Sequence, residues 1–300
     1  MSTPDATVID ALLAELDGLV GLEPVKEGVR RLVAIHRLNL ERVQQGEPII
    51  AQTVDVMFIG EPGTGEDAVA ALIGRLYAAL GILPDGALHE AGRGELVGVT
   101  AEESATRVAT VVAAAAGGVL LVDDVEQLLP VAPEDPAAAA LAALGAALGA
   151  RPAPMAMILS GPTAVLDALA DNLPAFAPAR ANALEFPRYT PDQLVAIFER
   201  GAGELRIEVP AEVQASLLQH FVQVHDGGDF RSARYVPALL GEMYARLATR
   251  TLADGTVEPE EHRAFVVADV PPPARAVGDA TGIRIGFSGD LGERSAASGA

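Results

Sequence analysis

The feature that most limits how this chain can fold is a short apolar segment followed at once by a glycine-rich turn and a helix. Residues 54–59 (VDVMFI) are typical of a buried strand, residues 60–67 (GEPGTGED) of a tight turn, and residues 67–80 of an amphipathic helix. Gly60 and Gly65 have four residues between them, which is the spacing of a phosphate-binding loop. In such a loop the backbone amides and the helix N-terminus face an anion.

Strand and helix patterns alternate along the first two thirds of the chain. Residues 119–122 (VLLV) and 155–159 (MAMIL) are short apolar runs, and residues 183–186 (ALEF) are a candidate for a fourth strand. The segments 104–116 and 137–148, which precede the runs at 119 and 155, have helical patterns. Strands that are apolar on both faces and separated by helices are typical of a parallel sheet covered on both sides. We therefore predict an α/β fold.

The pattern changes after Pro187, where three helical segments follow with no strand between them: 191–201, 210–224 and 229–251. The end of the chain is rich in Gly, Ala, Pro and Ser, which is typical of a disordered tail. These changes predict an N-terminal helix (1–17), a large α/β domain (18–187), a small helical domain (188–270) and a disordered tail (271–300).

The composition narrows the classes of partner. The formal net charge is −20, from 41 acidic and 21 basic residues, and such a surface repels nucleic acid and anionic lipid. The chain has no Cys, which excludes disulfides and thiolate chemistry. No apolar run reaches the roughly 20 residues of a membrane helix, and the acidic N-terminus does not resemble a signal peptide. We expect a cytoplasmic protein that contacts neither nucleic acid nor membrane.

The last two positions of the glycine-rich loop depart from the phosphate-binding pattern. Glu66 stands where a lysine bridges the β- and γ-phosphates, and Asp67 stands where a hydroxyl holds Mg²⁺. Lys26 is the only lysine in the chain, so no lysine nearby replaces it. Two unit charges about 5 Å apart at an effective dielectric near 20 interact by roughly 3 kcal/mol. Exchanging Lys for Glu turns that attraction into repulsion, so we expect ATP affinity to fall at least about 100-fold.

Two other interpretations of these carboxylates stay open. Acidic residues in a first helical turn stabilise the helix dipole, so Glu66 and Asp67 would fill from within the role that phosphate normally plays. Alternatively, the segment is an unrelated strand–turn–helix, and its glycines serve only the turn.

The order of three segments resembles one known family. Residues 20–26 (VGLEPVK), the glycine-rich loop, and residues 119–124 (VLLVDD) are similar to the CbxX/CfxQ branch of the AAA+ ATPases, over about residues 17–270. That branch includes red-type Rubisco activases and the ATPase domain of type VII secretion EccA proteins. The resemblance implies a P-loop NTPase core, with a parallel sheet flanked by helices, followed by a small helical lid (188–270).

The resemblance also implies a nucleotide site for ATP and Mg²⁺, whose binding we expect to be weak or lost. The residues at the adenine and phosphate positions are Val20, Gly21, Leu22, Gly60, Glu61, Pro62, Gly63, Thr64, Gly65, Glu66, Asp67 and Ala68. The positions near the metal are Asp67 and Asp123.

Five further residues match catalytic positions of the family. Asp123 would contact Mg²⁺ through water, and Asp124 replaces the Glu that polarises the attacking water, with a side chain one carbon shorter. Ser160 matches sensor 1, Arg180 the arginine finger supplied to a neighbouring subunit, and Arg231 sensor 2. Each also has a structural interpretation: the two aspartates as a helix cap, the serine as a turn residue, Arg180 as an ordinary surface arginine, and Arg231 as one of two arginines at helical spacing that pair with nearby acids.

The family's pore segment is also altered, since residues 96–101 (LVGVTA) lack its aromatic residue. Together these departures favour a catalytically impaired or inactive subunit of a protein-remodelling or scaffold assembly. It would form a homo-oligomer, or a hetero-oligomer with an intact paralogue that Arg180 could serve. The alternatives are an active ATPase that remodels a protein client, and a pure adaptor that reuses the fold as a binding surface.

Overall fold

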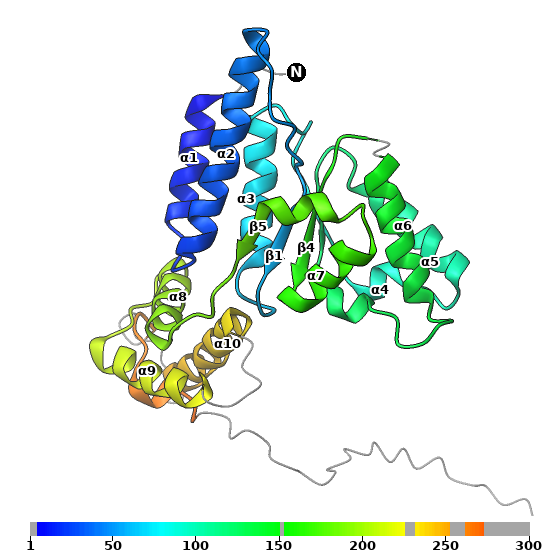
Figure 1. Cartoon of the computed structure of the whole chain (residues 1–300). Helices are drawn as coiled ribbons and strands as arrows, with labels where there is room; N and C mark the ends of the chain where they lie inside the picture. Colours follow the sequence, from blue (N-terminus) through cyan, green and yellow to red (C-terminus); the bar gives the residue numbers. More distant parts are fainter. Residues whose placement is uncertain (1–4, 151–152, 226–231, 253–261, 273–300) are drawn as a thin grey trace, which may run out of the picture.

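A computed structural model describes residues 5–150, 153–225, 232–252 and 262–272 of the chain (Figure 1). The tail predicted for residues 271–300 therefore lies outside the described residues, except for its first two. Among the helices in these ranges, none is both long and apolar enough to cross a bilayer.

The described residues contain a five-stranded sheet with the order β2-β3-β4-β1-β5, and every neighbouring pair is parallel. Its strands are β1 (Val56–Ile59), β2 (Leu88–Ala91), β3 (Val119–Val122), β4 (Ala156–Gly161) and β5 (Ala183–Glu185). Because all strands are parallel, their carboxyl ends share one edge, and the glycine-rich loop follows β1, which lies between β4 and β5, at that edge.

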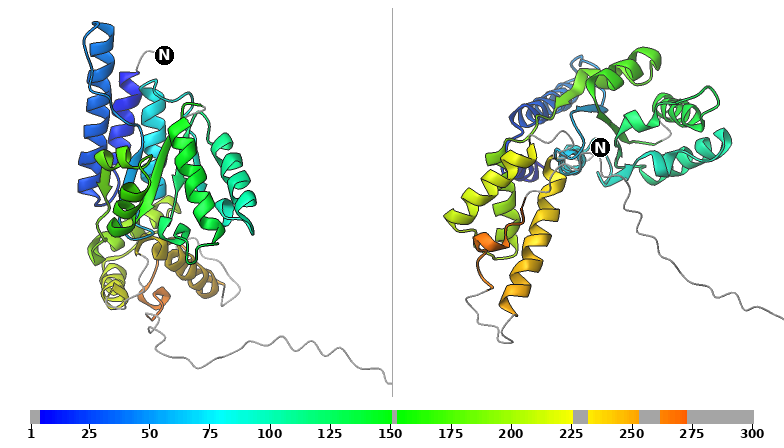
Figure 2. Two further views of the ribbon diagram at one scale, coloured as in Figure 1. Left: turned by 45° about the vertical axis from the view of Figure 1, so that its right-hand side comes forward. Right: turned by 90° about the horizontal axis from the view of Figure 1, so that it is seen from below.

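Helices cover both faces of the sheet, as the apolar strands predict (Figures 1 and 2). On one face, Phe58, Leu121 and Ile158 share a core with α1, α2 and α3. On the other face, Leu120 and Met157 share a core with α5, α6 and α7. The helices are α1 (Ala6–Asp17), α2 (Glu23–Gln44), α3 (Glu66–Ala79), α4 (Arg93–Leu96), α5 (Ala101–Ala114), α6 (Pro136–Ala150) and α7 (Thr163–Asn172).

The helical lid follows β5 and packs at the carboxyl edge of the sheet (Figure 1). It contains α8 (Pro191–Glu204), α9 (Ala211–His225) and α10 (Ser232–Thr251). The segment after α10 returns to the lid, where buried Asp269 pairs with Arg250 at 3.2 Å. His220 bonds through its two ring nitrogens to the Pro271 carbonyl (3.0 Å) and the Tyr235 hydroxyl (2.7 Å).

The sequence-based assignment is confirmed for the fold class but misses one strand. Edge strand β2 has the sequence LHEA and is only half-buried, so it lacks the apolar run by which the other strands are recognised. Three short 3₁₀ helices were also not predicted: η1 (Val125–Leu128), η2 (Ala177–Asn182) and η3 (Val267–Asp269). The domain limits inferred from the sequence stay predictions.

Candidate nucleotide site

The glycine-rich loop connects β1 to α3 and needs glycine at two positions. Gly63 and Gly65 have φ values of +85° and +96°, a region that favours residues without a Cβ atom. The Thr64 hydroxyl donates to the Glu61 carbonyl at 3.1 Å, which closes the turn. The loop thereby keeps the backbone shape that its glycine spacing predicts.

The Glu66 side chain folds back into the loop that precedes it. Its Oε2 accepts hydrogen bonds from the backbone amides of Gly63 (3.2 Å) and Thr64 (2.9 Å). The residue is 3% exposed, and its Oε1 is buried without a hydrogen-bond partner. Burial raises the pKa of Glu66 and the Asp123 carboxylate adds to this, whereas hydrogen bonds from Thr64 act in the opposite direction. The loop amides thus hold a carboxylate of the chain itself.

A second charged pair lies beside this loop. Asp123, directly after β3, accepts a hydrogen bond from the Arg234 guanidinium of the lid at 2.8 Å. The stem of Arg234 covers the loop, since a Cβ atom built on Gly63 would lie 2.9 Å from its Cγ. Asp124 has φ +51°, and its Oδ2 accepts from Gln127 at 2.9 Å. Helix α10 of the lid therefore contacts both the glycine-rich loop and the end of β3.

The segment between β5 and α8 contacts the same loop. The Tyr189 hydroxyl donates to the Thr64 carbonyl at 3.0 Å, and Arg188 forms an ion pair with Glu61. Burial, with the Glu66 and Asp67 carboxylates nearby, raises the pKa of Tyr189 to about 12. The hydroxyl consequently stays protonated at neutral pH and remains a donor.

The residues predicted to contact adenine lie next to the loop. Gly21 and Leu22 both have positive φ, at +61° and +60°, and Leu22 is buried. A Cβ atom built on Gly65 would lie 3.8 Å from Leu22 Cδ1, and one on Gly21 would lie 2.7 Å from Nε2 of Gln193 in the lid. Val20 is half-buried. The turn before α2, the loop and the lid therefore meet at one place.

The remaining predicted residues are only partly gathered here. Ser160 is buried on β4 beside Phe58 of β1, whereas Asp67 and Ala68 are exposed on the first turn of α3. Arg180 instead contacts α7, with ion pairs to Asp167 (3.2 Å) and Asp171 (3.0 Å). Arg231 lies outside the described residues.

Sequence reasoning missed the cation that the structure places at the site. Arg234 lies three residues after Arg231, in the segment GDFRSAR, and the family pattern pointed to the first of these two arginines. Within the described ranges, no group of three or more carboxylate or histidine side chains is arranged to hold a metal.

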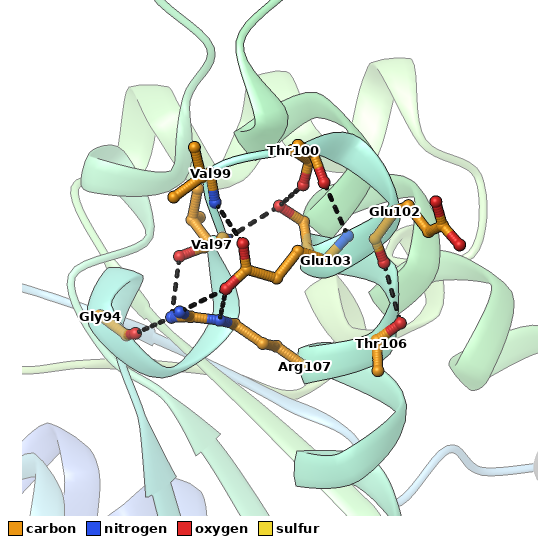
Figure 3. Close-up of polar contacts among 10 residues, drawn as sticks. Gly94, Val97, Val99, Thr100, Glu102, Glu103, Thr106 and Arg107 are labelled. Atoms are coloured by element: carbon orange, nitrogen blue, oxygen red, sulfur yellow. Dashed lines mark hydrogen bonds and ion pairs between the residues drawn. The ribbon is translucent and has the colours of Figure 1, made fainter.

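The segment that corresponds to the family's pore loop is tightly hydrogen-bonded (Figure 3). Arg107 donates to the carbonyls of Gly94 (2.8 Å) and Val97 (3.1 Å), and it pairs with Glu103 at 2.7 Å. Glu103 in turn accepts from the amide of Val99 at 2.8 Å. The Val99 side chain is 86% exposed, so this loop presents a small aliphatic residue to solvent.

Comparisons with known proteins agree with the fold. The AAA lid domain family matches residues 190–280. Stage V sporulation protein K of Bacillus subtilis (strain 168) is 26% identical over 82% of this chain and 77% of that protein. Protein CfxQ of Xanthobacter flavus is 28% identical over 82% and 78%, respectively. The crystal structure of the FIGL-1 AAA domain aligns with a TM-score of 0.56 at 19% identity, over 93% of this chain and 91% of that one, which shows a shared fold.

Proposed function

Because the chain belongs to the AAA+ ATPases of the CbxX/CfxQ family, we propose that it is a member with an impaired nucleotide site. In this proposal it acts as a non-hydrolysing subunit of a protein-remodelling or scaffold assembly. The observation that carries the proposal is the Glu66 carboxylate, held by the amides of Gly63 and Thr64 where family members would hold phosphate.

Those two hydrogen bonds oppose the binding of phosphate. A phosphate that enters the loop must displace the carboxylate from both amides, and a hydrogen bond to a charged group contributes about 1.5–3 kcal/mol. If the carboxylate stays nearby, two like charges about 5 Å apart add a repulsion of roughly 3 kcal/mol at a dielectric near 20. Either term alone supports a loss of ATP affinity of about 100-fold or more.

The residues around Asp123 do not fit the Mg²⁺ ion that accompanies ATP either. The Asp123 carboxylate is paired with the Arg234 guanidinium, so a cation of the chain stands where Mg²⁺ would be held. Asp124 has a shorter side chain than the glutamate it replaces, which shifts a general base by about 1.5 Å, and base catalysis is sensitive to such shifts. Both features support impaired hydrolysis as well as weak binding.

The same proposal implies that the chain binds another protein. A subunit with no working site of its own still offers the rest of the fold to a neighbour, either another copy or an intact paralogue. Arg180, now paired with Asp167 and Asp171, is 44% exposed and would have to leave these carboxylates to reach a neighbour's nucleotide. We therefore expect that Arg180 can contact the nucleotide of a neighbouring subunit only after its ion pairs with α7 have rearranged.

The test is titration calorimetry with ATP and Mg²⁺. We expect no heat of binding at millimolar nucleotide, and a micromolar Kd would refute the proposal. The variant Glu66→Lys with Asp67→Thr restores the consensus loop and is expected to regain nucleotide affinity. Its matched control, Glu61→Lys, adds a lysine to the same loop at an exposed position and is expected to regain none.

The assembly is tested separately by light scattering with and without ATP and Mg²⁺. A non-hydrolysing subunit is expected to show the same mass in both conditions. A larger assembly that forms only with ATP would favour the alternative, an active remodelling ATPase. Mixing with an intact paralogue would show whether the assembly is a hetero-oligomer.

A further inference from the structure

We propose that the lid is held closed over the phosphate loop in the absence of nucleotide, because two side chains of the chain replace the charges of a metal–triphosphate complex. Glu66 supplies the anion and Arg234 supplies the cation. This inference rests on the proposed function, in which nucleotide does not control the site.

The anion half is built into the large domain. Glu66 Oε2 bonds to two loop amides, and the side chain is almost fully buried at the N-terminus of α3. Helix N-termini with free amides bind anions, so a loop without one would leave Gly63 and Thr64 as unsatisfied donors. With Glu66 in place, the loop is complete and can serve as a fixed surface for the lid.

The cation half comes from the lid. Arg234 projects from α10 to Asp123 at the end of β3, with 2.8 Å between Nη2 and Oδ2. Burial acts to lower the pKa of Arg234, but the hydrogen bond and charge of Asp123, with the charges of Asp124 and Glu66, raise it overall. Its aliphatic stem packs over Gly63. One side chain thus contacts both the loop and the Asp123 carboxylate at the end of β3.

The charges around the loop explain why closure is favourable. Five carboxylates lie on the loop, the first turn of α3 and the end of β3: Glu61, Glu66, Asp67, Asp123 and Asp124. Two arginines from the lid side pair with two of them, Arg234 with Asp123 and Arg188 with Glu61. If the lid opened, both pairs would break, and the remaining cluster of like charges would have no counter-charge from these two residues.

Two further contacts hold the lid where it begins. The Tyr189 hydroxyl bonds to the Thr64 carbonyl, and Arg200 of α8 donates to the Gly18 carbonyl at the end of α1, at 3.0 Å. The lid is therefore attached on both sides of the loop, by α8 at the α1–α2 turn and by α10 at β3. None of these contacts requires a nucleotide.

The experiment measures the distance between the lid and the large domain by pulsed electron resonance of two spin labels. The chain has no Cys, so Ala164→Cys on α7 and Ala245→Cys on α10 provide the only labelling sites, and both positions are exposed. We expect one narrow distance population without nucleotide, unchanged by millimolar ATP and Mg²⁺. A second, broad population in the nucleotide-free protein, or narrowing only after ATP is added, would overturn the proposal.

Two variants test the ion pair itself. Arg234→Ala and Asp123→Asn each remove it, from the lid and from the sheet, and are expected to raise the open fraction by up to about five-fold. The matched control is Arg246→Ala, which removes an arginine of α10 that pairs with Glu242 within the helix. If both pair variants gave the same distances as the control, the proposal would be wrong.

The outcome is separable from that of the proposed function. If the protein binds ATP in calorimetry but shows a single narrow distance population without nucleotide, the impaired site is refuted and the closed lid is supported. If the protein binds no ATP but shows a broad distance population without nucleotide, the impaired site is supported and the closed lid is refuted.

Discussion

The two amide hydrogen bonds to Glu66 should contribute measurably to the free energy of unfolding. In Glu66→Ala the Gly63 and Thr64 amides lose their acceptor, and an unsatisfied buried donor costs about 1–3 kcal/mol. Glu61 of the same loop is exposed, so the loop lies near the surface and each donor should cost toward the lower end of that range. We expect a total loss of about 2–4 kcal/mol.

The matched variant is Glu66→Gln, which keeps an oxygen acceptor for both amides and removes the charge. Burial and the Asp123 carboxylate both disfavour that charge, as the raised pKa of Glu66 indicates. The glutamine variant should therefore stay within about 1 kcal/mol of the wild type, or exceed it.

Urea unfolding at neutral pH, followed by circular dichroism, measures both variants against the wild type. In thermal unfolding, the loss in Glu66→Ala corresponds to a decrease in Tm of roughly 4–16 °C, at about 2–4 °C per kcal/mol for a domain of this size. If Glu66→Ala were as stable as Glu66→Gln, the carboxylate would not be a structural part of the loop, and the reasoning from it would fail.

Four other substitutions test the packing and the lid. Gly74→Ala should destabilise by more than about 2 kcal/mol, because its Cβ would lie 2.2 Å from the Gly86 carbonyl oxygen. Gly241→Ala, with nothing within 4 Å, should stabilise by about 0.5–1 kcal/mol in the same urea assay. Tyr77→Phe should be neutral or stabilising by about 1 kcal/mol, since it removes a buried hydroxyl that has no partner, and a clear loss would imply a bridging water. Burial lowers the pKa of His220, so the folded state resists its protonation, and stability should fall as pH decreases below about 6.5. His220→Gln should show a shallower pH dependence, and equal slopes would contradict this.

The interior strands were predictable from their apolar runs, whereas of the two edge strands β5 was predicted and β2 was not. The run at residues 119–122 is buried throughout, so composition alone identifies β3. β2 lies at an edge and exposes Glu90, so its pairing with β3 depends on tertiary context. A fully enclosed strand can thus be recognised from its apolar sequence, whereas an exposed edge strand such as β2 cannot.

The candidate site was predictable in position but not in its pairings. The sequence left open whether Glu66 repels an anion or replaces one, because both outcomes use the same residue at the same helix N-terminus. The choice depends on a side-chain rotamer that directs Oε2 toward the Gly63 amide. The lid arginine that meets Asp123 was equally undetermined, because a pairing across 111 residues leaves no local pattern.

The apolar core on the α1–α3 face determines which parts of the protein should unfold together. Residues of the lid such as Phe198, Phe221 and Met243 belong to the same continuous core as Phe58 and Leu121 of the sheet, whereas α5–α7 share a separate one. Partial unfolding should therefore divide the molecule along the plane of the sheet rather than at the boundary between the lid and the large domain. Proteolytic fragments that keep the lid would be expected to keep α1–α3 with it.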